Sequence, residues 1–152
     1  AWKAYRIPEM AETLDLLLTL FPFEPNCFKG TGLKTVFVGH PLLEVLPKPS
    51  GKKEPILSLF PGSRFGAIRS TFPIQLKAAR RFLKEHPEYK LAISCASPEF
   101  KPYLYSSTLD LKPIFFNKDE QYHWMDKSQL AFATSGTVTM ELAHFATPTV
   151  VF

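Results

Sequence analysis

From residue 56 onward, the pattern of hydrophobic and polar positions switches repeatedly between two periods. Short apolar runs typical of buried strands alternate with segments in which apolar residues recur every three or four positions. The apolar runs predict strands at 56–60, 91–95, 113–116, 130–133 and 148–152. The segments between them predict helices at 70–85, 98–105, 121–127 and 137–145. Strands separated by helices imply crossover connections, so the expected fold class is α/β with a parallel sheet.

The helix predicted at 70–85 has one apolar stripe. Its members are spaced at i, i+4, i+7 and i+11: Phe72, Leu76, Ala79 and Leu83. This spacing puts all four on the face that packs against the sheet. The basic residues of this helix lie largely on other faces and are interpreted as solvated. Phenylalanines assigned to the core are Phe65, Phe72, Phe115 and Phe116.

The first forty residues repeat this pattern at shorter length. They predict a helix at 7–14, a buried strand at 16–21, a short helix at 24–30 and a strand at 35–38. The next segment has the composition of a linker, because residues 41–55 carry four prolines, three lysines and a glycine. We therefore expect parts of two α/β domains. Residues 1–40 form the C-terminal part of the first, 41–55 is the interdomain linker, and 56–152 is a truncated second domain.

Composition narrows the class of ligand. The 152 residues include 18 basic and 14 acidic side chains, a net charge of +4 that is too mild for a dedicated nucleic-acid binder. This charge suits an anionic small ligand or an anionic membrane surface equally well.

Cys27 and Cys95 form no CxxC pair, which favours reduced thiols and a cytoplasmic location. The four histidines lack metal-ligand spacing, so we expect no metal site. No apolar run approaches the roughly 18 residues that span a bilayer, which leaves peripheral contact as the membrane option.

Pro61-Gly62-Ser63-Arg64, which we call the first turn, joins a predicted strand to a predicted helix. Gly62 allows a ligand to approach the backbone closely, and backbone N–H groups at a helix start favour an anion. Ser63 adds a hydroxyl, and Arg64 can make a charge-assisted contact to phosphate worth roughly 1.5–3 kcal/mol. The pattern is neither GxxxxGK[ST] nor GxGxxG, which argues against kinase-like and dinucleotide sites. Taken alone, the four residues favour an ordinary strand-to-helix turn.

Ser135-Gly136-Thr137, the second turn, stands in the same position after another predicted strand. Ser135 is expected to cap the following helix. Glu141 borders the buried stripe of that helix, where a carboxylate needs a hydrogen-bond donor. The paired hydroxyls of a ribose would supply one, and a structural hydrogen bond explains the residue equally well.

Two further residues are candidates for a cleft. His40 follows the strand at 35–38 and precedes the linker, which would allow it to reach an interdomain cleft. The position favours a structural hydrogen bond in the turn over a catalytic role. Tyr122 belongs to the aromatic string 121–124, which fits a base or sugar site and ordinary helix packing equally.

At this point the residues resemble the lipid-A-disaccharide synthase family, the glycosyltransferases of Gram-negative outer-membrane lipid synthesis. The resemblance rests on strings whose order and spacing hold over nearly the whole chain: Ala1-Trp2-Lys3, Leu17 to Glu24, Phe37 to Leu42, Leu59 to Arg64, and Ala133 to Thr137 with Glu141 and Pro148. The stretch from about 97 to 128 matches poorly.

The resemblance implies a B-type glycosyltransferase, with parts of two Rossmann-like parallel-sheet domains that bind acceptor and donor. The family joins UDP-2,3-diacylglucosamine to 2,3-diacylglucosamine 1-phosphate, releases UDP and inverts the anomeric carbon without metal or cofactor. Gly62, Ser63 and Arg64 would hold the diphosphate, and Ser135, Gly136, Thr137 and Glu141 would complete the nucleotide site. The implied location is the cytoplasmic face of the inner membrane, as a peripheral protein.

The chain begins with Ala1 and ends within a predicted strand, so we expect a fragment. The family's catalytic base is expected outside it, and the fragment alone would bind nucleotide weakly without turnover. Two other classes stay open. One is another B-type UDP-sugar enzyme, either an epimerase or the peptidoglycan-precursor transferase. The other is a non-catalytic UDP-binding module.

Overall fold

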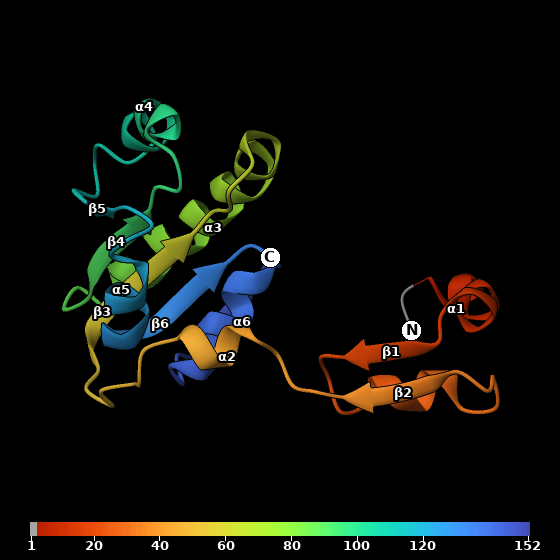
Figure 1. Cartoon of the computed structure of the whole chain (residues 1–152). Coiled ribbons are helices and arrows are strands. Elements are labelled where there is room, and N and C mark those ends of the chain that lie inside the picture. Colours follow the sequence, from red (N-terminus) through yellow and green to blue (C-terminus); the bar gives the residue numbers. More distant parts are fainter. Residues whose placement is uncertain (1–2) are drawn as a thin grey trace. The chain divides into compact units, whose positions relative to one another are not determined.

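The computed structural model describes residues 3–152, and it divides the chain into two compact units. Unit 1 extends to Val45, and unit 2 runs from Leu46 to Phe152 (Figure 1). The boundary falls inside the predicted linker, 41–55. Of the string Ala1-Trp2-Lys3, the first two residues lie outside the described part of the chain.

Unit 1 is built on two parallel strands. Its elements are η1 (Ala4–Arg6), α1 (Ile7–Thr13), β1 (Leu16–Thr19), η2 (Glu24–Phe28), β2 (Lys34–Phe37) and α2 (Leu42–Val45), where η marks a 3-10 helix. In the pairing of β1 with β2, Leu16 lies opposite Lys34 and Thr19 opposite Phe37. The Glu24 carboxylate accepts hydrogen bonds from the backbone N–H groups of Leu20 and Phe21, which fixes the turn after β1.

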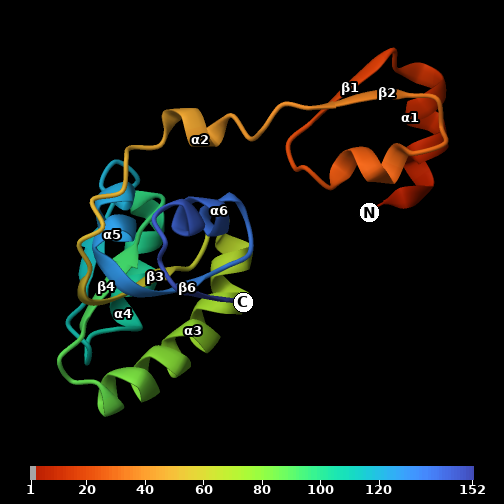
Figure 2. The ribbon, with the colours of Figure 1, turned by 90° about the horizontal axis from the view of Figure 1, so that it is seen from below.

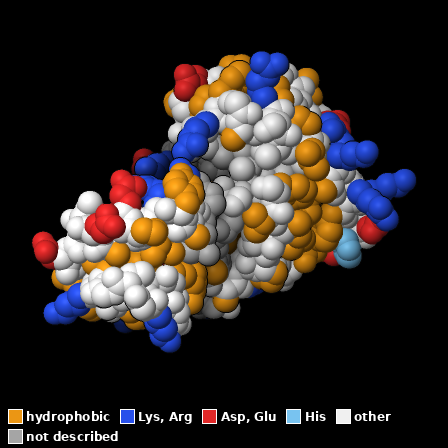
Figure 3. All heavy atoms as spheres, turned by 90° about the vertical axis from the view of Figure 1, so that its right-hand side faces the viewer, with side chains coloured by type: hydrophobic (Ala, Val, Ile, Leu, Met, Phe, Trp, Pro, Cys, Tyr) orange, Lys and Arg blue, Asp and Glu red, His pale blue; other side chains and the backbone are white. Residues whose placement is uncertain are grey.

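The strand near residue 16 is not buried as predicted. Leu16 and Leu18 are 45% and 55% exposed, and Val36 of β2, which lies opposite Leu18 on the same face, is 39% exposed. The reason is that, within residues 3–152, the sheet of unit 1 has two strands and one apolar face that no other element covers. Hydrophobic side chains gather in broad surface patches on the face of the molecule drawn in Figure 3.

Unit 2 contains a five-stranded, fully parallel sheet in the order β5-β4-β3-β6-β7. The strands are β3 (Glu54–Phe60), β4 (Lys90–Ser94), β5 (Ile114–Phe116), β6 (Ser128–Ala133) and β7 (Thr149–Val151). The helices between them are α3 (Phe65–Glu85), η3 (Pro98–Phe100), α4 (Lys101–Ser106), α5 (Gln121–Lys127) and α6 (Thr137–His144). The predicted α/β class, the five strands and their parallel arrangement are therefore confirmed.

Helices cover both faces of this sheet (Figure 2). Leu57 and Leu59 of β3 point to the face that packs against α3 and α4. Ile56 and Phe60 point to the opposite face, which packs against α5 and α6. This alternation is what period-two side chains produce in a strand buried on both sides. The predicted α3 stripe lies in the first of these clusters, with Leu83 at its edge.

Helix α3 begins one turn earlier than predicted, at Phe65 instead of near residue 70. Gly66 and Pro73 are poor helix formers and weaken the signal in the sequence. The additional turn places Ile68, which is fully buried, in the core one turn before Phe72. Tertiary packing thus outweighs local propensity at this helix start.

Two of the four phenylalanines assigned to the core are less buried than expected. Phe65 is 44% exposed, since it lies at the start of α3 and packs on Phe100 and Tyr103 beyond the end of the sheet. Phe115 is half-buried because its strand, β5, is at the edge of the sheet. Phe72 and Phe116 are buried as predicted.

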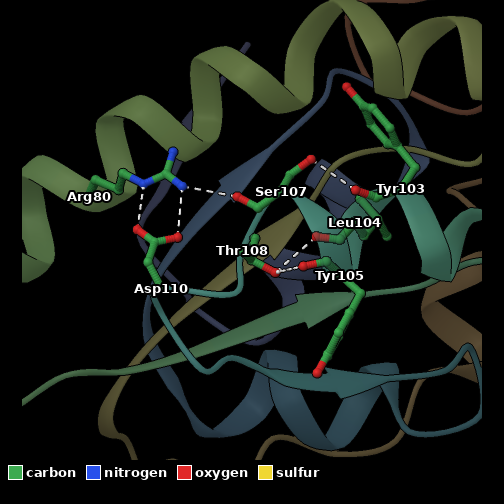
Figure 4. Close-up of polar contacts among 7 residues, drawn as sticks. All are labelled: Arg80, Tyr103, Leu104, Tyr105, Ser107, Thr108 and Asp110. Carbon is green, nitrogen blue, oxygen red and sulfur yellow. Dashed lines mark hydrogen bonds and ion pairs between the residues drawn. The ribbon is translucent and has the colours of Figure 1, made fainter.

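A polar cluster ties α3 to the loop after α4 (Figure 4). The Arg80 guanidinium donates two hydrogen bonds to the Asp110 carboxylate and one to the Ser107 carbonyl. Thr108 is fully buried there, and its hydroxyl donates to the Leu104 carbonyl at 2.8 Å. These bonds fix the loop on the face of the sheet that α3 covers.

Residues 46–55, the second part of the predicted linker, belong to unit 2 and are anchored to its helices by hydrogen bonds. The Lys53 ammonium donates to the carbonyls of Met125 and Phe145 and to the Thr147 hydroxyl, at 3.3, 2.9 and 2.7 Å. Burial lowers the pKa of Lys53, and Asp126 acts in the opposite direction. The segment therefore holds the C-terminal ends of α5 and α6 in place. None of the helices in the described residues is both long and apolar enough to cross a membrane.

Candidate functional site

A cavity of about 330 Å³ opens in unit 2 at the carboxyl ends of the central strands. The first turn lines it with Gly62, Ser63 and Arg64, and the second turn lines it with Ser135, Gly136 and Thr137. Six of the nine residues predicted for the site, counting the two cleft candidates, are thus together around one cavity.

The sheet topology explains why the two turns meet. Chain order runs from β3 outward through β4 to β5, and then returns to β6 on the other side of β3. Strands β3 and β6 are therefore neighbours whose following helices cover opposite faces of the sheet. Such a switch point leaves a crevice at the carboxyl ends of the strands, where α/β proteins bind ligands.

The first turn has a backbone that requires glycine. Gly62 has a φ of +116°, a region that other residues rarely adopt. A Cβ at this position would lie 3.8 Å from the Ala67 Cβ and 3.9 Å from the Thr134 Cβ, so the backbone and not the space excludes a side chain. Arg64 is extended and comes directly before α3, whose first N–H groups have no partner within the helix. This end of α3 carries partial positive charge beside the cavity.

The second turn is held by other contacts. The Ser135 N–H donates to the Phe152 carbonyl at 3.1 Å, and the Thr139 hydroxyl donates to the Gly136 carbonyl at 2.7 Å. The prediction that Ser135 caps the helix is wrong. Helix α6 begins at Thr137, so Gly136 occupies the cap position and Ser135 stands one residue too early. No side chain among the described residues caps this helix start.

Glu141 is 8% exposed and lies on α6 outside the lining of the cavity. Its carboxylate accepts a hydrogen bond from the Tyr122 hydroxyl of α5 at 3.3 Å. Burial raises the pKa of Glu141, and the bond from Tyr122 and the charge of Lys118 act in the opposite direction. Burial, followed by the charge of Glu141, raises the pKa of Tyr122. The structural hydrogen bond considered for Glu141 therefore exists, and a contact of Glu141 with ribose remains a proposal.

With this geometry established, the comparison with known families is decisive. The model of one family, described as lipid-A-disaccharide synthetase, matches residues 1–152. The chain belongs to the lipid-A-disaccharide synthetase family. The resemblance recognised in the sequence is thereby confirmed.

Curated members of the family are similar over almost the whole chain. The lipid-A-disaccharide synthase of Nitrosococcus oceani is 32% identical over 99% of this chain and 42% of its own length. That of Geobacter sulfurreducens is 31% identical with the same coverage. The chain thus spans about two-fifths of the length of these synthases, as the 42% coverage shows.

Solved structures agree on the fold. The pneumococcal O-GlcNAc transferase GtfA, solved in complex with UDP and GlcNAc, superposes with a TM-score of 0.61 at 14% identity. A GtfA/B complex superposes with a TM-score of 0.63 at 16% identity. Each alignment covers 97% of this chain and 32% of the other. The predicted B-type glycosyltransferase fold, with parts of two parallel-sheet domains, is confirmed.

His40 belongs to unit 1 of this lipid-A-disaccharide synthetase family member. Its Nδ1 accepts a hydrogen bond from the Leu42 N–H at 3.2 Å, and its ring lies 6.1 Å from that of Phe21. The turn hydrogen bond considered for His40 is present. Its placement in an interdomain cleft stays a prediction.

The cavity also includes residues that the sequence did not single out. Ser94 and Ala96 come from the carboxyl end of β4, and Thr134 precedes the second turn. Gln121, which also lines the cavity, belongs to the string 121–124 that the sequence offered for a base or sugar site. The end of β4 could have been found by applying the carboxyl-end rule to every predicted strand. Among residues 3–152, no group of three or more His, Cys, Asp and Glu side chains is arranged to hold a metal ion.

Proposed function

We propose that unit 2 is the donor-nucleotide-binding part of an inverting glycosyltransferase. The full-length protein would join UDP-2,3-diacylglucosamine to 2,3-diacylglucosamine 1-phosphate and release UDP. The observation that carries this proposal is the convergence of both turns on one cavity at the switch point of a sheet in this family. The UDP bound to the pneumococcal transferase of the same fold supports a nucleoside diphosphate as ligand.

In the proposed reaction, an acceptor hydroxyl oxygen forms the new bond to the anomeric carbon of the donor. The bond from that carbon to the diphosphate oxygen breaks with its electron pair, so negative charge grows on the leaving UDP. Arg64 and the N-terminal end of α3 supply positive charge where the diphosphate would lie. Groups already oriented toward this charge stabilise the transition state without reorganising during the step.

Further assignments complete the proposal. The second turn and Glu141 would bind the rest of the nucleotide, with Glu141 accepting from ribose hydroxyls. Tyr122 is proposed to orient Glu141, and His40 to face the acceptor side. Unit 1 is proposed as part of the acceptor domain, and the base that receives the proton of the attacking hydroxyl is expected outside residues 1–152.

Both proposed substrates carry acyl chains, so we also propose peripheral contact with the cytoplasmic face of the inner membrane. A net charge of +4 would favour an anionic surface. Exposed apolar side chains such as Leu16, Leu18 and Phe37 support a contact with lipid chains.

The test is a transfer assay with the full-length protein and the two acylated substrates. We expect the disaccharide 1-phosphate and UDP to appear in equal amounts, with the opposite anomeric configuration in the product. Donor alone should release UDP much more slowly. Conversion of a UDP-sugar to its epimer without transfer would indicate the epimerase class. UDP binding with no turnover under any of these conditions would indicate a non-catalytic module, and either result would overturn the proposal.

A further inference from the structure

A polar network centred on Thr134, in the lining of the cavity, links the ends of the two strands that carry the turns. The Thr134 hydroxyl donates to the Pro61 carbonyl at 2.9 Å, across the boundary between β6 and β3. Helix α3 contributes two side chains, one turn apart, on the side facing this contact. The Gln75 Nε2 lies 3.2 Å from the Thr134 hydroxyl, and the Thr71 hydroxyl lies 3.0 Å from it.

Hydrogen-bond chemistry gives this network a direction. A hydroxyl donates one hydrogen and accepts up to two. Because Thr134 donates to Pro61, it accepts from Gln75, whose amide nitrogen is a donor. The chain of bonds therefore runs from Gln75 through Thr134 to the first residue of the first turn.

Gln75 is an energetically unfavourable residue at this buried position. It is fully buried, and its Oε1 has no hydrogen-bond partner within residues 3–152. Burying an unpaired amide oxygen disfavours folding, and an apolar side chain of similar size would avoid that penalty. The bonds from its Nε2 to Thr134 and, at 3.5 Å, to the Phe60 carbonyl are what the amide contributes.

Packing reinforces the same link. The Cβ and Cγ2 of Thr134 both lie 3.9 Å from the position that a Cβ would take at Gly62. The Thr134 N–H donates to the Phe60 carbonyl at 2.9 Å. Thr134 thus contacts the first turn while it immediately precedes the second.

We propose that Thr134, held by Gln75, is a positioning residue that sets the distance and orientation between the two anion-binding turns. This inference rests on the proposed function, because it assumes that the turns share one diphosphate. A diphosphate bridging two turns is sensitive to their separation, whereas a single phosphate can be held by one of them. The network should therefore matter more for UDP than for UMP.

The experiment measures dissociation constants of UDP and UMP for variants of the full-length protein. Gln75→Met is the main variant, since it removes the amide at similar volume together with its unpaired oxygen. It should fold with unchanged or increased stability, and the UMP-to-UDP ratio of dissociation constants should fall about three- to tenfold. Thr134→Val should lower that ratio about tenfold, and Thr134→Ser, which keeps the hydroxyl, should restore it.

Thr108→Val is the matched control, because it deletes a hydrogen-bonded threonine hydroxyl that lies away from the cavity. It should lower the melting temperature and leave the ratio unchanged. Should Thr134→Val fail to fold, Gln75→Met decides the question. A ratio that stays at the wild-type value in Gln75→Met would overturn the inference. When the ratio in Gln75→Met is unchanged, Arg64→Ala separates the two claims. Loss of UDP affinity in Arg64→Ala then refutes only the positioning role, whereas unchanged UDP affinity in Arg64→Ala means that the proposed function fails as well.

Discussion

The first and second turns line the same cavity from neighbouring parallel strands, yet they bring different chemistry to it. The first ends in Arg64 and leads into α3, a helix of 21 residues. The second offers the hydroxyls of Ser135 and Thr137 and leads into α6, a helix of 8 residues. Positive charge thus comes from one turn and neutral hydrogen-bonding groups come from the other.

Their glycines differ as well. Gly62 has a φ of +116°, a conformation that strains any residue with a side chain. Gly136 has a φ of 160°, which is extended backbone open to other residues, and a Cβ there would meet nothing within 4 Å. The first turn therefore depends on its glycine for its shape, and the second turn depends on contacts made by its neighbours.

The largest expected effect comes from removing the charge of the first turn. Arg64→Ala should weaken UDP binding about 10- to 100-fold, because a charge-assisted hydrogen bond to phosphate is lost. The UDP affinity of Arg64→Lys should lie between those of the wild type and Arg64→Ala, since lysine keeps the charge and loses the bidentate geometry. Calorimetric titration at fixed ionic strength measures the change.

Arg69→Ala is the control for that substitution. Arg69 is an exposed arginine on the same helix, and its guanidinium lies 5.9 Å from the centre of the Phe65 ring, outside the cavity lining. Its loss should change UDP affinity little. Equal losses for both variants would mean that general surface charge, and not the first turn, attracts the nucleotide.

Much of the fold could be predicted because, along unit 2, the hydrophobic periodicity of each element and the turn residues at its ends indicate the same boundaries. Helix α5 has the bounds predicted for it, Gln121–Lys127, and each predicted strand overlaps an observed one. The start of α3 was missed because burial of Ile68 outweighs Gly66 and Pro73. The exposure of β1 was missed because apolar composition does not show whether a second layer covers a strand.

The candidate site was predictable only as far as chain order determines it. The two turns could be placed together because parallel strands end at one edge of their sheet. The hydrogen-bond partner of Glu141 could not be predicted, because Tyr122 reaches Glu141 from another helix. The link from Gln75 to Thr134 was also hidden, because Gln75 reads as an ordinary polar residue of an amphipathic helix until its burial is known.

A second prediction uses the difference between the glycines. Gly62→Ala should lower the free energy of unfolding by about 1–3 kcal/mol, the strain of an unfavourable backbone conformation, and should weaken UDP binding too. Gly136→Ala should leave stability nearly unchanged, because its backbone is extended and its surroundings are open. Denaturant unfolding of both variants gives the comparison. Similar destabilisation by the two substitutions would show that the turns are equally constrained.

The smallest expected effect concerns Glu141, behind the second turn, and depends on pH. Its pKa is raised, so between its ordinary value near 4.3 and its raised value the folded protein holds a proton that the unfolded chain has lost. Stability from this group is therefore lost as pH rises through that interval. Glu141→Gln, which cannot ionise, should gain melting temperature relative to wild type as pH increases from about 3.5 to 7.

Tyr122→Phe sharpens that measurement. The Tyr122 hydroxyl donates to the Glu141 carboxylate and holds its pKa down, against the effect of burial. Without the hydroxyl, Glu141 should be harder to ionise, so Tyr122→Phe should lose stability more steeply than wild type over the same pH range. In the double variant with Glu141→Gln this added slope should disappear. A slope that persists in the double variant would assign the pH dependence to another group and leave Glu141 without a measurable electrostatic penalty.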